Sequence, residues 1–175
     1  MIVSVFGSSS TQPNSDEWQG AETLGRLLAE QGYTVATGGY GGSMEALSKG
    51  ASDVGGKVIG VTAPDVFKSR AGANAYVTEE VNAPHLLERI HLLTDSSSAA
   101  IALPGSLGTL TEIMTAWNLA YVAPFAGVDA KPLIVIGERW ANIVSFLADE
   151  LGTGLDLIHS VATVEDAVKV LQKSV

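Results

Sequence analysis

The feature that most constrains the fold of this chain is one order of segments repeated along its 175 residues. Short apolar runs rich in β-branched residues are each followed by a glycine or serine turn and then by a segment with helical periodicity. Strands buried on both faces have such continuous apolar runs, and helices between them connect parallel strands. The pattern therefore predicts an α/β fold with a mainly parallel sheet and helices on both faces.

This pattern predicts five strands, with a weaker sixth near Tyr76–Thr78. The five are Ile2–Phe6, Thr34–Thr37, Lys57–Val61, Ala99–Leu103 and Pro132–Ile136. Helices are expected at about 15–31, 43–54, 84–95, 108–122, 139–150 and 163–173, and Thr163 followed by Asp166 is a plausible cap for the last one. No Ser/Pro-rich linker divides the chain, so we expect a single doubly wound, Rossmann-like nucleotide-binding domain over residues 1–175.

Composition narrows the range of partners. The formal net charge is −9 and the ten basic residues are scattered, so we expect no nucleic-acid binding. No cysteine is present, which excludes disulfides and a cysteine nucleophile. No apolar run reaches the roughly 18 residues of a membrane span, and the first residues do not resemble a signal peptide. We therefore expect a cytoplasmic protein without membrane contact.

Two of the strand-to-helix turns are rich in small residues. The ligands of open parallel sheets sit beyond the carboxyl ends of the strands, where helix N-termini point. The first turn offers hydroxyls that could hold phosphate or ribose, although an ordinary serine-rich capping turn has the same composition. In the second, glycines bring the backbone close to a ligand. The candidate ligand-binding residues are Gly7, Ser8 and Ser9 in the first turn, and Gly38, Gly39, Gly42 and Met44 in the second.

The third turn follows the strand Ala99–Leu103 and is the most specific. Its candidate ligand-binding residues are Pro104, Gly105, Ser106, Gly108 and Thr109. The next helix presents free N–H groups and its positive dipole end to an anion there. Glu112 has two interpretations at this stage. The spacing Thr109-x-x-Glu112 is that of a capping box, which would place the glutamate in the first helical turn, whereas a carboxylate beside a bound ribose could be catalytic.

Other titratable residues carry less information. Arg89 lies on a segment with a strong apolar face, and a solvated surface arginine is its default interpretation. His85 and His91 have no carboxylate partner at metal-ligand spacing. Because the sequence offers neither a ligand cluster nor a Walker-type lysine, we expect no metal and no cofactor.

Taken together, these segments resemble the LOG family of cytokinin-activating nucleoside 5′-monophosphate phosphoribohydrolases, and their relatives, the molybdenum-cofactor carrier proteins. The similarity covers about residues 2–175, and the most specific part is Pro104-Gly105-x-x-Gly108-Thr109-x-x-Glu112. The resemblance implies that this glycine turn holds a 5′-phosphate and that Glu112 is catalytic. It places the family's catalytic arginine at Arg89.

The implied activity is hydrolysis of the N-glycosidic bond of an AMP-like nucleotide, and the alternative is a non-catalytic nucleotide or molybdenum-cofactor carrier. The chain departs from the LOG pattern at four positions. Ser106 replaces a glycine of the motif, Ile90 replaces the lysine after the arginine, and Thr37 and Glu45 stand where the second turn would carry glycine. The apolar stripe Ile113, Met114, Trp117 and Tyr121 could be core, but with the resemblance it predicts a homodimer.

Overall fold

The computed structural model describes residues 1–70 and 72–174. The strands are β1 (Ile2–Phe6), β2 (Thr34–Thr37), β3 (Val58–Thr62), β4 (Glu79–Asn82), β5 (Ala99–Ala102), β6 (Leu133–Ile136) and β7 (Ile158–Val161). The helices are α1 (Asp16–Glu30), α2 (Ser43–Ser52), α3 (Leu86–Asp95), α4 (Leu107–Val122), the short 3₁₀ helix η1 (Ala123–Ala126), α5 (Glu138–Leu151) and α6 (Val164–Ser174). Among these helices, none is long and apolar enough to cross a bilayer.

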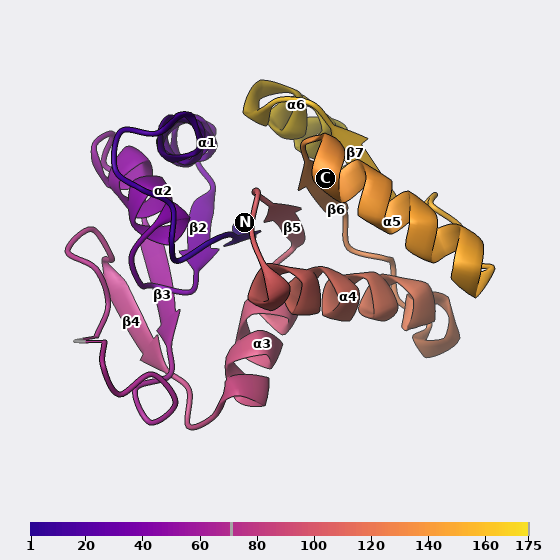
Figure 1. The fold of residues 1–175 in the computed structure, drawn as a ribbon, viewed down its shortest axis with the longest axis horizontal. Helices are drawn as coiled ribbons and strands as arrows, with labels where there is room; N and C mark the ends of the chain where they lie inside the picture. The colour runs from indigo at the N-terminus through magenta and orange to yellow at the C-terminus, as the bar shows by residue number, and fades with distance from the viewer. Residues whose placement is uncertain (71, 175) are drawn as a thin grey trace.

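The strands form one seven-stranded sheet in the order β4-β3-β2-β1-β5-β6-β7, and every neighbouring pair is parallel. Figure 1 shows β4 and β7 at opposite ends of this sheet. The predicted Rossmann-like α/β class is confirmed. The direction of winding reverses between β1 and β5, so the turns after these two strands flank the crevice where such sheets bind ligands.

Two apolar cores cover the two faces of the sheet. One contains residues of α1, α2 and α6, such as Leu24, Leu47 and Leu171, and the other contains residues of α3, α4 and α5, such as Leu93, Trp117 and Trp140. Neighbouring residues of β1 and β5 contribute to opposite cores, which is why these strands are apolar at nearly every position.

Two strands differ from the sequence-based expectation, and the short helix η1 was not expected either. The weak strand expected near Tyr76–Thr78 lies three residues later, as β4, and the edge strand β7 was not expected at all. Both are edge strands with polar or charged residues, as in Glu79-Glu80 of β4 and His159-Ser160 of β7, so they lack a continuous apolar run. The cap expected at Thr163 is present, because the Asp166 N–H donates to Thr163 Oγ1 over 3.2 Å.

Candidate functional site

A pocket lies at the carboxyl edge of the sheet, beside the crevice between β1 and β5. We call it the crevice pocket. Nine of the residues expected from the sequence line it: Gly7, Ser9, Gly38, Met44, Arg89, Ser106, Gly108, Thr109 and Glu112. The turns after β1, β2 and β5, which are far apart in the sequence, thus meet around one space, together with side chains from α3 and α4.

Arg89 projects from α3 into this space, but it is not a surface residue. Only 7% of it is exposed. Its Nε donates to Val61 O over 2.8 Å, and its Nη2 donates to Gly38 O over 3.0 Å. A Cβ on residue 38 would lie 1.8 Å from Arg89 Nη2, so Gly38 is glycine because the guanidinium occupies that position. The backbone of two strand ends therefore fixes the orientation of Arg89.

Glu112 faces Arg89 from the opposite wall, with 3.8 Å between Glu112 Oε1 and Arg89 Nη1. Burial raises the pKa of the Glu112 carboxyl from 4.5 to about 7, and the positive charge of Arg89 opposes that rise. Near neutral pH the group therefore exists in both protonation states. A carboxyl with such a pKa can donate or accept a proton in that range, as acid–base catalysis requires.

The capping box considered for Glu112 is wrong. Helix α4 begins at Leu107 with Ser106 as its N-cap, so Thr109 is the third helical residue and Glu112 lies beyond the first turn. The expected helix began one residue later, which placed Thr109 near the cap position. The carboxylate of Glu112 is thus directed at Arg89, not at the backbone of the helix start.

The start of α4 has the properties of an anion site. No side chain caps it and no acidic residue lies in its first turn, whereas α1 has both the Ser15 cap and Asp16 with Glu17. Its first N–H groups are therefore open to a ligand. Among the described residues, the buried Thr109 Oγ1 has no hydrogen-bond partner. A buried hydroxyl without a partner costs about 1–3 kcal/mol, so a ligand oxygen that accepts from it would be stabilised.

Gly108 adds a steric argument. A Cβ on this residue would meet no atom within 4 Å, so no contact within the described structure requires glycine there. Gly108 lines the crevice pocket, and a glycine on a pocket wall allows a ligand to approach the backbone closely. At Gly105, by contrast, a Cβ would lie 2.1 Å from Thr109 Oγ1, so this glycine is needed to pack the turn onto the helix.

Five of the expected ligand-binding residues do not line the crevice pocket: Ser8, Gly39, Gly42, Pro104 and Gly105. Their contacts build the turns. Gly42 has a φ of 72°, and a Cβ there would lie 2.4 Å from Ser8 O, so it lets the turns after β1 and β2 pack together. Ser8 O accepts from the N–H of Ser43, the first residue of α2, over 2.8 Å. Gly39 O accepts from Asn74 N over 2.7 Å, which ties the second turn to the segment before β4.

Helix α5 supports the turn after β5 from behind. Trp140 is buried, and its Nε1 donates to Leu103 O over 2.9 Å. Arg139 Nη1 donates to Gly105 O over 3.3 Å. These two bonds fix carbonyl groups directly before α4, so the backbone that presents the helix N-terminus to the pocket is held in place.

The sequence-based list missed four lining residues: Val5, Phe6, Phe67 and Arg70. Val5 and Phe6 belong to β1 itself, where an apolar strand gives no sign of a pocket. Phe67 and Arg70 come from the segment that connects β3 to β4, for which the sequence pattern predicts no element before Tyr76. The basic Arg70 in a segment that leaves the carboxyl edge of the sheet was the one signal available.

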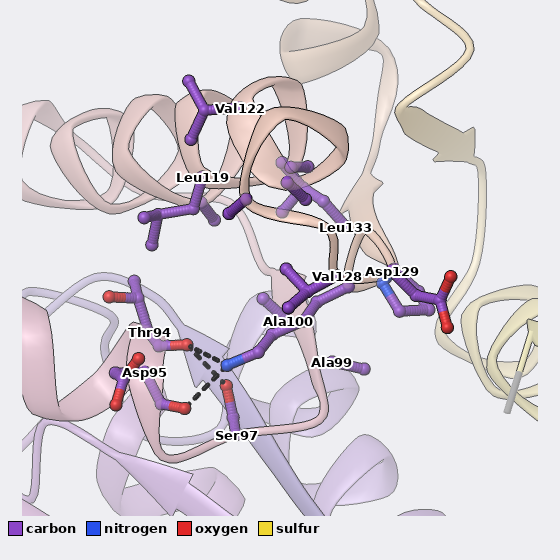
Figure 2. A pocket seen from close by; sticks show the side chains of 16 residues that line it. Thr94, Asp95, Ser97, Ala99, Ala100, Leu119, Val122, Val128, Asp129 and Leu133 are labelled. Carbon is purple, nitrogen blue, oxygen red and sulfur yellow. Dashed lines mark hydrogen bonds between the residues drawn. The ribbon is translucent and has the colours of Figure 1, made fainter.

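A second cavity lies at the opposite edge of the sheet, where β5 and β6 begin. Figure 2 shows that Ala99, Ala100, Leu119 and Leu133 line it. The Lys131 ammonium beside it donates to Thr94 O over 3.2 Å and to Asp95 O over 2.6 Å, at the end of α3. These bonds satisfy carbonyl groups of a helix C-terminus, which is a structural role. The largely apolar lining offers less chemistry than the crevice pocket.

Within residues 1–70 and 72–174, no group of three or more His, Asp or Glu side chains is arranged to hold a metal ion.

The chain is similar to known proteins in sequence and in fold. The sequence model of the SLOG cluster4 family matches residues 1–166. A cytokinin riboside 5′-monophosphate phosphoribohydrolase of Mycobacterium marinum is 31% identical over 80% of this chain and 72% of its own length. The enzyme of the same name from Mycobacterium tuberculosis is 31% identical over 70% of this chain, and the match spans only 63% of that relative.

A solved structure shares the fold. The molybdenum cofactor binding protein of Rippkaea orientalis superimposes with a TM-score of 0.78 at 23% identity, over 98% of this chain and 95% of that one. At this level of identity the likeness establishes the arrangement of strands and helices alone.

Proposed function

Because the chain belongs to the SLOG cluster4 family and has LOG phosphoribohydrolases among its relatives, we propose that it hydrolyses the N-glycosidic bond of an AMP-like nucleoside 5′-monophosphate. The products are the free base and ribose 5-phosphate. The observation that carries this proposal is the buried pair of Glu112 and Arg89, placed in one pocket with the uncapped N-terminus of α4.

The proposed ligand lies with its 5′-phosphate at the start of α4. The free N–H groups of the first turn and the unpartnered Thr109 hydroxyl donate to the phosphate oxygens. Gly108 supplies room for that approach. The ribose then extends toward Glu112, which lies further along the same helix.

The reaction breaks the bond between C1′ of the ribose and the base nitrogen, and its electron pair leaves with the base. Positive charge develops on the sugar, and the ionised Glu112 carboxylate stabilises it. A water adds to C1′ and loses a proton to Glu112, which returns that proton as the base takes one up. Arg89, fixed by Val61 O and Gly38 O, keeps the carboxylate oriented and partly ionised.

A non-catalytic carrier of a nucleotide or molybdenum cofactor is the second candidate. The position after Arg89 favours it, since Ile90 is a buried apolar residue where LOG proteins have a lysine. A carrier would use the same phosphate-binding turn without the bond cleavage.

Incubation with a panel of purine and pyrimidine nucleoside monophosphates separates the two candidates. We expect equal amounts of free base and ribose 5-phosphate from at least one of them, with activity unchanged by EDTA. Binding of a nucleotide without release of base from any member of the panel would favour the carrier.

A further inference from the structure

The donor groups of Arg89 are largely committed within the protein. Its Nε and Nη2 donate to Val61 O and Gly38 O, and its Nη1 faces Glu112 Oε1 at 3.8 Å. The side-on edge of the guanidinium, formed by Nε and Nη2, is therefore occupied by backbone carbonyls, and its Nη1 faces a carboxylate, not the phosphate-binding turn. The positive charge of Arg89 is also partly neutralised by the carboxylate of Glu112. A second cation in the pocket would therefore add charge compensation for a bound phosphate that Arg89, paired with Glu112, supplies only in part.

Arg70 is the other basic residue that lines the crevice pocket. It is half-buried, and among the described residues its guanidinium forms one hydrogen bond, from Nη2 to Ser9 Oγ over 3.2 Å. Ser9, in the turn after β1, lines the same pocket as Ser106 and Gly108 at the start of α4. Unlike Arg89, Arg70 thus has most of its donors free, and it is directed at the turns where the phosphate is expected.

An aromatic pair holds the two arginines near each other. The rings of Tyr40 and Phe67 pack edge to face with 5.5 Å between centroids. Arg70 Cζ lies 4.5 Å from each centroid, and Arg89 Cζ lies 5.6 Å and 5.7 Å from them. Burial first, and the charge of Arg70 to a smaller extent, lower the pKa of Arg89. Two guanidinium groups in such a confined space create a positive potential that a bound anion would relieve.

We propose that Arg70 is the phosphate-binding cation of this site, donating to the ligand's phosphate, while Arg89 serves the carboxylate. The inference rests on the proposed function in so far as the ligand carries a phosphate monoester. Ser9 Oγ occupies one donor of Arg70 when no ligand is bound, and a phosphate oxygen takes its place. The stacking on Tyr40 and Phe67 keeps the guanidinium in position, so little freedom is lost on binding.

Titration calorimetry with ribose 5-phosphate, the product that is not consumed, and with adenosine, which lacks the phosphate, tests this assignment. In Arg70→Ala we expect affinity for ribose 5-phosphate to fall about 10- to 100-fold, the range for lost charge-assisted hydrogen bonds. Affinity for adenosine should change by less than about threefold. Arg70→Lys, which keeps the charge but not the planar fork, should fall between the two.

Lys68→Ala is the matched control, because Lys68 is an exposed cation of the same segment that does not line the pocket. It should bind both ligands like the unmodified protein. Arg70→Gln, which keeps a donor for Ser9 without the charge, provides a second neutral variant if the alanine variant is poorly folded, and thermal unfolding checks both.

Unchanged affinity of Arg70→Ala for ribose 5-phosphate would overturn the assignment, as would an equal loss of affinity for both ligands. If the unmodified protein binds neither ribose 5-phosphate nor AMP, the proposed function fails along with it. If the unmodified protein binds these ligands and the Arg70 variants bind ribose 5-phosphate with unchanged affinity, the proposed function stands and Arg70 has another role.

Discussion

A buried carboxyl group beside a guanidinium can lower its free energy by taking up a proton or by pairing with the cation. Glu112 is balanced between the two, because burial favours the protonated form and Arg89 at 3.8 Å favours the ionised form. Arg89, held by two backbone carbonyls, cannot move away. The position of this balance near pH 7 is what suits Glu112 to proton transfer.

The same balance makes a stability prediction. The pKa of Glu112 is raised from 4.5 to about 7 in the folded protein. The contribution of this group to the free energy of unfolding is therefore fully present below pH 4.5, and it is lost as the pH rises through 7. The Glu112→Gln amide does not titrate. As the pH rises from about 5 to about 8, the free energy of unfolding of the variant should therefore increase relative to that of the unmodified protein, by on the order of 2–3 kcal/mol. Urea unfolding across that range measures the difference, and a difference independent of pH would contradict the shifted pKa.

At this scale the sequence could supply candidate residues but not their arrangement. Arg89 and Glu112 were both candidates through the family resemblance, while spacing alone favoured a surface arginine and a capping glutamate. The burial of Arg89 depends on Val61 and Gly38, which are distant in sequence. The capping box failed because α4 begins at Leu107, and that start depends on how the turn at Pro104 and Gly105 packs. Local patterns contain neither fact.

Among the elements, the close packing of α1 against α2 is the most sensitive to one added methyl group. A Cβ on Gly25 would lie 2.0 Å from Leu47 O, whereas a Cβ on Gly20 of the same helix would meet nothing within 4 Å. Gly25→Ala should therefore destabilise the fold by about 1–3 kcal/mol or more. Gly20→Ala should stabilise it by about 0.5–1 kcal/mol, since alanine is the better helix former.

Denaturant unfolding of the two variants side by side measures this effect, because both changes add the same methyl group to one helix. Equal stability of the two variants would mean that α1 and α2 are not packed as closely as described.

The elements themselves were predictable to different degrees. The central strands β1 and β2 fall at the expected residues because burial on both faces leaves an unbroken apolar run. The edge strands β4 and β7 carry polar residues on their open sides, so their pairing with β3 and β6 is decided by the sheet and not by local composition. Phe67 and Arg70 of the crevice pocket lie in the segment just before β4, where the sequence also lacks a clear periodic pattern.

For the whole molecule, the alternation of strands and helices predicted the sheet class, and the class predicted the location of the crevice. Assembly stays a prediction. Of the stripe expected at an interface, Ile113 and Trp117 are core residues, whereas Tyr121 is 52% exposed. Phe125, in η1 directly after α4, is 84% exposed and packs against Tyr121, so one exposed apolar surface lies at the end of α4.

We predict a homodimer that buries this surface. Light scattering at micromolar concentration should give twice the chain mass of 18.1 kDa. Phe125→Ser should shift the protein toward monomer, while Phe146→Ser, which removes an exposed phenylalanine from α5, should not. A monomer in the unmodified protein, or dissociation by the α5 variant alone, would place the interface elsewhere or exclude it.

The central claim is that the crevice pocket is a hydrolytic site and that Glu112 acts on the ribose. Its most direct test compares turnover and binding of AMP in Glu112→Gln, with Glu138→Gln, an exposed carboxylate outside the pocket, as the control. The account predicts that Glu112→Gln lowers turnover by a factor on the order of 10²–10⁴, because the charge that stabilises the cationic sugar is gone. Its affinity for AMP should change by less than about tenfold, since the phosphate contacts remain. Turnover equal to that of the unmodified protein would contradict the account.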